Sequence, residues 1–315
     1  MFYVGIDVGG TKTAYGLFDE NRRLIDKCKQ PSDSSLAADV FFEGLVHAVH
    51  DLLRRNALTI GDLAGVGVGL PSFIEYDRGY ILKTSNLTKL KDFAARDDLQ
   101  RRLGADVRIV LDNDAHVAAL AEHRYGAGRG FRHMLYCPVS TGISSALIIE
   151  GKLFRGSYGF AGESGHQIIT PGAGLMCGCE NRGCFMSYVS GSMIVRHIQG
   201  WIASGESTVM TALAGSAQAI TAEHVLAGYD RGDAMAIRAV EQMAAYMAVW
   251  LYNLYLTLNI NCFVFGGGLM AFGDRLFSRV RAQFDAYNAN DYPVFFKPAE
   301  LTQDCGIIGA AELLF

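Results

Sequence analysis

The spacing of apolar residues predicts strands at the start of the chain, followed by a helix. Apolar residues dominate 2–8 and 13–18, and small polar residues separate these runs, which is typical of two strands joined by a turn. A third strand is predicted at 24–28. From Leu36 to Leu53, apolar residues recur at intervals near three and four, which predicts an amphipathic helix.

Later in the chain, short apolar runs alternate with longer helical patterns. Buried strands are expected at residues 66–70, 107–111, 133–139, 143–149 and 262–265. Helices are expected after residue 114 and at 192–203, 221–227, 233–258, 274–287 and 306–314. Strands interleaved with helices predict an α/β fold. The pattern of strand, small-residue turn and strand occurs twice, at the start and again from residue 133, so two related halves are expected.

Composition restricts the class of protein. Of 315 residues, half are apolar and 19% are charged, with only six prolines, so a sizeable core is expected rather than a disordered or collagen-like chain. The net charge of −4, without runs of Lys or Arg, argues against general nucleic-acid binding. The uncharged stretch between Glu241 and Asp274 contains three asparagines, so a buried helix and strand are expected there instead of a membrane span.

Three of the seven cysteines lie within eight positions, at Cys177, Cys179 and Cys184. Together with His166 they form a Cys₃His set, which suits structural, tetrahedral zinc. Three unliganded thiols in a glycine-rich loop are the alternative. Clustered thiols suggest a reducing compartment, and the N-terminus lacks the basic region of a secretory signal, so a cytoplasmic protein is expected.

The turn after the first strand is a candidate anion site. It reads Asp7-Val8-Gly9-Gly10-Thr11-Lys12, and successive N–H groups in such a turn can surround an anion. Thr11 adds a hydroxyl donor, and Asp7 is suited to hydrated Mg²⁺. An ordinary hairpin turn remains the alternative reading of these residues.

Two further turns strengthen the case for a bound nucleotide. The second half has Ser140, Thr141 and Gly142 in the place that corresponds to the first turn. A buried strand is followed by Gly266, Gly267 and Gly268, which allow a third close approach of the backbone, suited to a nucleoside. Three such turns in this order are more specific than any one of them.

Polar residues with candidate chemistry lie at two other places. Asp112, Asn113 and Asp114 precede a helix, where such residues cap the helix, and a rigid carboxylate there also suits a base that accepts a hydroxyl proton. Glu163 and His166 lie in a glycine-rich stretch that is not expected to be helical. They could hydrogen-bond adjacent sugar hydroxyls, or belong to a polar surface loop.

Taken together, these motifs resemble the ROK family (repressor, open reading frame, kinase) of the actin/hexokinase/Hsp70-type ATPase superfamily. The resemblance covers nearly the whole chain. Its motifs are residues 7–12, Gly67-x-Gly69-x-Pro71, Asn86-Leu87, Asn113-Asp114 with Ala118 and Glu122, 141–143, 162–166, 177–184 and 266–268. It implies a two-lobed actin-like (ribonuclease H-like) α/β fold with a cleft between lobes, the first lobe being residues 1–115 with 300–315 and the second 116–299.

The resemblance also implies ATP-dependent phosphorylation of a hexose or a hexose derivative. Asp114 would be the general base toward the acceptor hydroxyl, often the 6-OH. Asn86, Asn113, Glu163 and His166 would hold the sugar. Mg-ATP would be bound by Asp7, Gly9, Gly10, Thr11, Lys12, Ser140, Thr141, Gly142, Gly266, Gly267 and Gly268, and structural zinc by His166, Cys177, Cys179 and Cys184. A homodimer, formed through second-lobe helices, is implied as well.

The chain departs from the family pattern near both ligands. Ser140, Ser144 and Ser145 stand where glycines are usual, so their side chains would narrow the phosphate loop. Met186 stands where family kinases usually carry a glutamate that contacts the sugar near its anomeric end. Since methionine cannot accept that hydrogen bond, a modified sugar, a glycoside or a rarer aldose or ketose is expected to fit better than plain glucose.

These departures leave a second interpretation, a sugar-binding sensor with weak or no kinase activity. Repressors of the family carry an N-terminal DNA-binding domain, and the phosphate motif here begins at Asp7, so a repressor is not expected. The presence of Asp7, Lys12 and Asp114 favours the kinase over the sensor.

Overall fold

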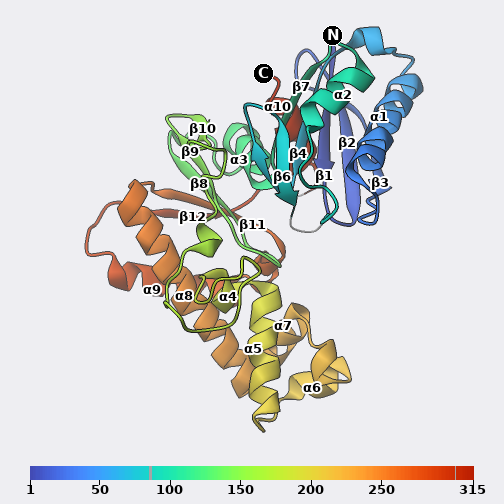
Figure 1. Ribbon diagram of the computed structural model, residues 1–315. Coiled ribbons are helices and arrows are strands. Elements are labelled where there is room, and N and C mark those ends of the chain that lie inside the picture. The colour runs from blue at the N-terminus through green and yellow to red at the C-terminus, as the bar shows by residue number, and fades with distance from the viewer. Residues whose placement is uncertain (85–86, 302) are drawn as a thin grey trace. The chain divides into compact units, whose positions relative to one another are not determined.

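A computed structural model describes residues 1–84, 87–301 and 303–315, and the chain divides into two compact units (Figure 1). The first unit contains residues 1–132, 146–161 and 299–315, and the second contains 133–145 and 162–298. The domain boundaries expected from the sequence differ from these units: the boundary after residue 115 falls inside the helix Asp114–Tyr125, which belongs to the first unit. Among the described residues, no helix has the length and apolar character that a membrane crossing requires.

The first unit is built on a five-stranded sheet in the order β3-β2-β1-β4-β7. The strands are β1 (Phe2–Val8), β2 (Lys12–Asp19), β3 (Leu24–Pro31), β4 (Leu63–Leu70) and β7 (Arg108–Asn113). β1, β2 and β3 pair antiparallel, whereas β1, β4 and β7 run parallel. The parallel register sets Asp7 opposite Gly69, and Gly69 opposite Asp112, so the carboxyl ends of these strands bring the candidate residues to one edge of the sheet.

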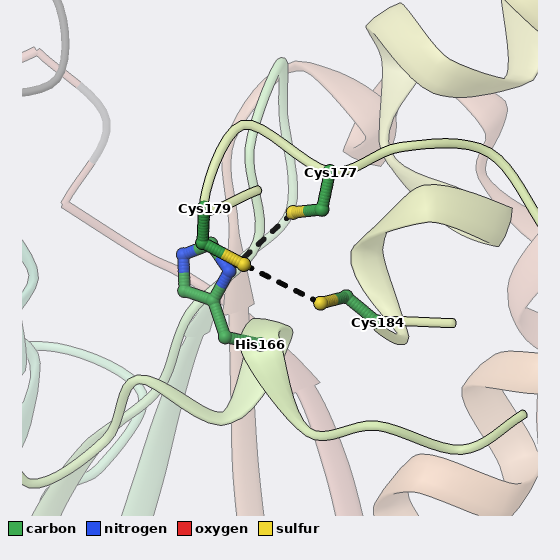
Figure 2. Close-up of side chains that lie close together, drawn as sticks. All are labelled: His166, Cys177, Cys179 and Cys184. Carbon is green, nitrogen blue, oxygen red and sulfur yellow. Dashed lines mark hydrogen bonds between the residues drawn. The ribbon is translucent and has the colours of Figure 1, made fainter. Parts of the chain in front are cut away.

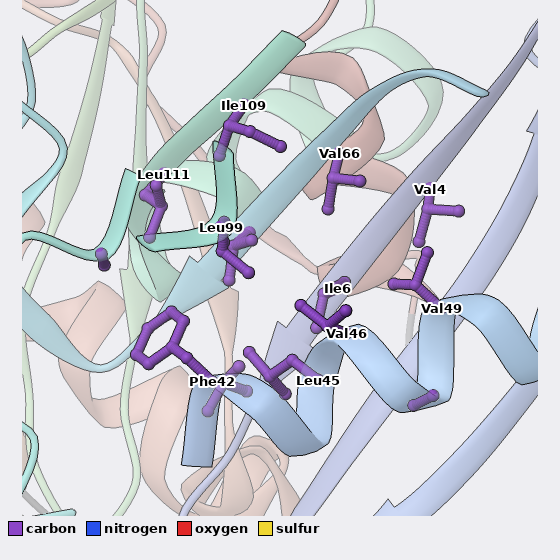
Figure 3. Packing of buried hydrophobic residues seen from close by; sticks show 14 of the residues in the cluster. Val4, Ile6, Phe42, Leu45, Val46, Val49, Val66, Leu99, Ile109 and Leu111 are labelled. Atoms are coloured by element: carbon purple, nitrogen blue, oxygen red, sulfur yellow. The ribbon is translucent and has the colours of Figure 1, made fainter. Parts of the chain in front are cut away.

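One face of this sheet is covered by α1 (Ala38–Arg55) and α2 (Ala95–Leu103). Alternate β1 residues, Val4 and Ile6, point into this core, where they meet Leu45 and Val49 of the amphipathic helix α1 (Figure 3). Phe42 of α1 and Leu99 of α2 extend the same core toward β7. The apolar residues that recur every three to four positions in α1 lie on one side of the helix, and their burial stabilises the packing of α1 against the sheet.

The other face of the sheet packs against α10 (Cys305–Glu312), and α10 in turn packs against α3 (Asp114–Tyr125). The approach is close because glycines form the contact. A Cβ atom at Gly5 would collide with the Ile307 carbonyl, and one at Gly67 with the Ala310 carbonyl. A Cβ atom at Gly309 would collide with the Val117 carbonyl of α3. These glycines therefore set α10 directly on β1 and β4, with its N-terminus toward the Asp7 edge.

Two hairpins complete the first unit. β5 (Ser72–Glu75) pairs antiparallel with β6 (Tyr80–Thr84), and β9 (Ala146–Ile149) pairs antiparallel with β10 (Lys152–Phe154). The spacing of apolar residues does not predict four elements of this unit, because they are short or highly charged. These are the strands β5, β6 and β10 and the polar helix α2.

The second unit holds β8 (Met134–Pro138), β11 (Cys262–Gly266) and β12 (Phe295–Pro298), which pair in parallel. Its helices are α4 (Met186–Val189), α5 (Gly191–Ala203), α6 (Val209–Ala214), α7 (Ala222–Asp230), α8 (Ala234–Leu258) and α9 (Asp274–Tyr287). The uncharged stretch forms the buried helix α8 and the buried strand β11, as predicted. Trp250 of α8 stacks on Phe185 with ring centroids 4.6 Å apart.

Most predicted strands and helices are confirmed within a few residues, and the strand at 143–149 is the main exception. Only residues 146–149 form β9, while Ile143 makes an isolated antiparallel bridge to Val139. The ladder breaks because the backbone N–H and the hydroxyl of Ser145 both bond the Gly162 carbonyl. The stretch around Glu163 also differs from expectation, since Ser164–His166 form one turn of 3₁₀ helix.

Candidate functional site

The predicted turn after β1 is present, closed by a hydrogen bond from the Gly9 N–H to the Lys12 carbonyl at 2.9 Å. Thr11 and Lys12 are exposed, while Gly9 and Gly10 are half-buried. The Thr11 carbonyl accepts from the Ser32 N–H of the segment after β3. The turn is thus anchored from β3 and leaves the Thr11 and Lys12 side chains open to a ligand.

Asn113 and Asp114 lie where β7 ends and α3 begins. Asn113 is the N-cap: its Oδ1 accepts from the Ala115 N–H at 2.8 Å, and its Nδ2 donates to the Ser72 carbonyl at 3.1 Å. Asp114 is the first helical residue, exposed, with Oδ1 2.9 Å from the same N–H. Capping therefore belongs mainly to Asn113, and the Asp114 carboxylate is held at a helix N-terminus with its surface accessible.

The electrostatics of Asp7 and Asp114 are linked. Burial raises the pKa of Asp7 to about 6, the negative charge of Asp114 adds to this shift, and Lys29 opposes it. Although Asp114 is exposed, the surrounding protein desolvates its carboxyl group and raises its pKa as well. Two carboxyl groups with raised pKa values at the end of one sheet are typical of a site for acid–base chemistry or for a metal ion.

Sequence reasoning missed a network of hydrogen-bonded charged side chains around Asp112, two residues before Asp114. The carboxylate of Asp112 accepts from His116 Nδ1 and from Arg155 Nε, each at 2.7 Å. The guanidinium of Arg155 also covers the ring of Tyr76, 3.8 Å from its centroid. Arg155, the β5–β6 hairpin and the 156–160 loop line a cavity of about 460 Å³ within the first unit. The sequence indicated only that Asp112 is a polar residue at the start of a helix. Its contact with Arg155 could not be predicted, because the two residues are far apart in the sequence.

Glu122, one of the residues that carry the family resemblance, is structural. It is fully buried in α3, and its carboxylate accepts from the N–H groups of Ala127, Glu300 and Leu301. It thereby ties the segment that leads into α10 to the helix that carries Asp114.

In the second unit, the two predicted nucleotide turns meet. The Val139 N–H donates to the Gly266 carbonyl, and the Val139 carbonyl accepts from the Leu269 N–H. Gly267 lies in the left-handed region at φ +90°, and a Cβ there would collide with the Val139 carbonyl. The residues 266–268 therefore lie against the start of the 140–142 turn, and their binding of one ligand stays a prediction.

The N-terminus of α5 lies at the same turn. The Gly191 N–H donates to the Ser140 carbonyl at 2.8 Å, and the Ser192 hydroxyl donates to the Thr141 carbonyl at 2.9 Å. Thr141 and Gly142 are exposed. A turn with two exposed residues, placed at the positive end of a thirteen-residue helix, is suited to binding phosphate.

The serines that replace glycines do not all enter the phosphate turn. The side chain of Ser145 is buried, and its hydroxyl lies 2.8 Å from that of Ser164 and 3.1 Å from the Gly162 carbonyl. The expected narrowing of the loop by Ser145 is therefore wrong, because this side chain points toward the turn of Glu163 and His166. Gly165 of that turn has no room for a Cβ against the Ile143 carbonyl.

Glu163 and His166 are half-buried, with His166 Nε2 3.9 Å from a carboxylate oxygen of Glu163. Met186 is the first residue of α4, and its terminal methyl lies 3.8 Å from the Cβ position that could be built on Gly142. Met186 therefore lies beside the 140–142 turn. Asn86, predicted to hold the sugar, lies outside the described residues.

The four predicted metal ligands come together (Figure 2). The ligand atoms of His166, Cys177, Cys179 and Cys184 all lie within 4.8 Å of one another. His166 Nδ1 is 3.5 Å from Cys177 Sγ, and the Sγ atoms of Cys179 and Cys184 are 3.5 Å apart. A tetrahedral zinc ion, with Zn–S about 2.3 Å and Zn–N about 2.0 Å, places its ligands roughly 3.5–3.8 Å apart. The donor types and their spacing therefore fit zinc.

Known proteins resemble the chain along most or nearly all of its length. The model of the ROK family matches residues 3–315. A glucokinase of Halalkalibacterium halodurans is 30% identical over 99% of this chain and 94% of its own. An N-acetyl-D-glucosamine kinase of Escherichia coli O127:H6 is 31% identical over 86% of this chain and 85% of its own.

Solved structures resemble the chain as well. A ROK hexokinase from Thermus thermophilus has a TM-score of 0.80 at 30% identity, covering 99% of this chain and 97% of that one. A ROK family glucokinase from Streptomyces griseus, in complex with glucose and AMPPNP, has a TM-score of 0.78 at 27% identity, covering 99% of both chains. Fold and relatives define the protein as a sugar kinase with an actin-like, two-domain α/β fold. The chain belongs to the ROK family.

Proposed function

We propose that this kinase transfers the γ-phosphoryl group of Mg-ATP to the 6-OH of a hexose or a hexose derivative, with Asp114 as the general base. The observation that carries the proposal is the placement of Asp114. Its carboxylate is accessible, fixed by the first turn of α3, and has a raised pKa. A base of this kind accepts the proton of the attacking hydroxyl as that oxygen bonds to phosphorus.

The other groups have roles that follow from their chemistry. Asp7 would hold Mg²⁺, and the turn of Gly9, Gly10, Thr11 and Lys12 would donate to phosphate oxygens. In the second unit, residues 140–142 would bind phosphate at the N-terminus of α5, while residues 266–268 would lie along the nucleoside. Because phosphoryl transfer needs little covalent help from the protein, positioning and charge stabilisation account for most of the catalysis.

The sugar would be held by hydrogen bonds to its other hydroxyls. Asn86, Asn113, Glu163 and His166 are the proposed partners. His166 Nδ1 faces the cysteines, whereas Nε2 faces the Glu163 side, so a metal-bound ring can still offer one nitrogen to the substrate. Zinc on His166, Cys177, Cys179 and Cys184 would supply a rigid tether for this loop.

Met186 bears on which sugar is accepted. The thioether of Met186 offers an apolar surface next to the 140–142 turn. A glutamate at this position would instead need a hydroxyl group of the sugar as a hydrogen-bond partner. We therefore propose that a sugar with an apolar or bulky substituent, such as a glycoside or an N-acetylated hexose, is phosphorylated in preference to glucose. We also propose that the kinase works as a homodimer in the cytoplasm, which light scattering and cell fractionation would test.

ADP release with Mg-ATP across a panel of sugars tests the function. The panel contains glucose, mannose, fructose, allose, N-acetylhexosamines and β-glucosides, with Asp114→Asn as the matched variant. We expect turnover with at least one sugar and a loss of three or more orders of magnitude in Asp114→Asn. Turnover unchanged in that variant would refute the assigned base. Thermal stabilisation by a sugar without turnover would favour a sensor over a kinase.

A further inference from the structure

Three charged side chains form a buried network at the start of α3, and the proposed reaction uses none of them directly. Asp112 and His116 are 2% and 3% exposed, and Arg155 is half-buried. Asp112 Oδ1 accepts from His116 Nδ1, and Asp112 Oδ2 accepts from Arg155 Nε, both at 2.7 Å. Asp112 Oδ1 also accepts from the Asn113 N–H at 2.8 Å, so the network reaches the residue next to Asp114.

The partners of His116 determine its protonation state. While Nδ1 faces the Asp112 carboxylate, Nε2 lies 3.1 Å from the Ala161 carbonyl oxygen. Neither oxygen carries a proton, so both ring nitrogens donate only when the ring is an imidazolium. Burial opposes this charge, yet the hydrogen bond and charge of Asp112 outweigh burial and raise the pKa of His116. The network therefore contains one negative and two positive groups.

The same contacts join two separate parts of the first unit. Asp112 ends β7 and His116 lies in the first turn of α3, whereas Arg155 and Ala161 bracket the 155–161 segment. Ala161 precedes Glu163 by two residues in the chain. A buried ion network often adds little net stability over an apolar core, and its directional bonds are better explained by a need for defined geometry.

We propose that Asp112, His116 and Arg155 are positioning residues for the phosphoryl transfer. They hold the start of α3, with Asn113 and Asp114, against the 155–161 segment, and the positive charge of His116 favours the ionised carboxylate of Asp114. This inference rests on the proposed role of Asp114. Asp112 and His116 are buried, so they do not contact the substrate and act only through Asn113 and Asp114.

The charge part of the proposal has a defined sign. The groups that face Asp114 electrostatically are Asp7 from β1, whose negative charge favours the protonated acid, and His116, whose positive charge favours the carboxylate. His116 itself faces Asp112 and Arg155. Removing the positive charge at His116 therefore raises the pKa of Asp114, and activity is lost at a higher pH than in the wild type.

Three variants separate positioning from a merely structural role. Arg155→Lys keeps the charge and replaces the Nε donor with an ammonium, Arg155→Met removes both, and His116→Asn keeps a donor toward Asp112 but loses the charge and the Ala161 contact. The measurement is kcat and KM for sugar and for ATP from pH 5 to 9, with thermal unfolding on each variant. Wild type and Asp114→Asn are measured first, so that failure of the proposed base is seen separately.

We expect kcat/KM for the sugar to fall about tenfold to a hundredfold in Arg155→Met and His116→Asn, with KM for ATP unchanged. The acid limb of kcat/KM should move to higher pH in His116→Asn and stay in place in Arg155→Lys, which should retain most activity. Folded variants with wild-type kcat and an unmoved acid limb would overturn the proposal.

A second measurement does not depend on activity. In ¹³C-histidine NMR of the wild-type chain, one of the eight histidines, assigned by its absence in His116→Asn, should remain an imidazolium at pH 7. In Arg155→Lys and Arg155→Met, this histidine should not titrate at lower pH as long as His116 keeps its contact with Asp112. Titration at lower pH in either variant would show that the substitution disturbs that contact. A neutral His116 ring at pH 7 in the wild type would also overturn the proposal.

Discussion

The N-terminal turn of α10 leaves room for the Asp7 carboxyl group only because residue 306 is glycine. A Cβ atom at Gly306 would lie well inside 3.0 Å of the Asp7 carboxyl carbon, closer than real Cβ contacts come. The helix cannot retreat easily, since Gly5 and Gly67 already set its backbone against β1 and β4. The position of Asp7 is therefore determined by a residue almost three hundred positions away.

Gly306→Ala should displace the Asp7 side chain while the fold is kept. We expect kcat with the best sugar to fall by about tenfold or more, since misplacing a catalytic group by about 1 Å costs up to a hundredfold. Gly44→Ala in α1 is the control, because nothing lies within 4 Å of the added methyl group. Steady-state ADP release compares the two, and equal activity would contradict a role for Asp7 at this position.

The raised pKa values of Asp7 and Asp114 predict an acid limb in the pH profile. In the proposed reaction both groups act as carboxylates, so kcat/KM should fall as the pH drops through about 6, the pKa of Asp7, rather than near 4. Lys29 lowers the pKa of Asp7, so Lys29→Met should move the limb to higher pH and Lys29→Arg should not. An acid limb near 4 in all three proteins would contradict the assignment.

Removing one cysteine of the Cys₃His cluster should remove the metal. Cys184→Ser is expected to reduce zinc, measured by mass spectrometry of the purified protein, from about one ion per chain to nearly none, with a lower Tm. Cys28→Ser is the control, since Cys28 lies on β3 in the first unit. Equal zinc content in both variants, or none in the wild type, would contradict a zinc site.

Met186→Glu tests the proposed preference for a substituted sugar. A carboxylate beside the 140–142 turn offers a hydrogen-bond acceptor and a negative charge in place of an apolar methyl group. We expect the ratio of kcat/KM for glucose over that for a β-glucoside to rise about tenfold or more, the usual worth of one polar contact. Met186→Leu is the control for side-chain shape. An equal change of the glucose to β-glucoside ratio in both variants would contradict the proposed effect of Met186 on sugar preference.

Much of the fold was predictable because its signals are local. The strand β1 matches the predicted residues 2–8. The uncharged stretch before Asp274 contains most of α8 and all of β11, as its apolar pattern predicts. Alternation and helical spacing depend on neighbouring residues only, so one sequence suffices to detect them. The missed strand β12 and helix α6 have only four and six residues, too few for a period to be recognised.

The sequence by itself determined which chemistry is available: the residues of the three glycine-rich turns, the Asp114 carboxylate and a Cys₃His set within nineteen positions. Only the tertiary structure decided what each group contacts. It joined Arg155 to Asp112, forty-three residues away, set Gly306 against Asp7, and turned Ser145 toward Ser164. Such contacts depend on the path of the chain through the sheets, and residue spacing along the sequence carries no information about that path.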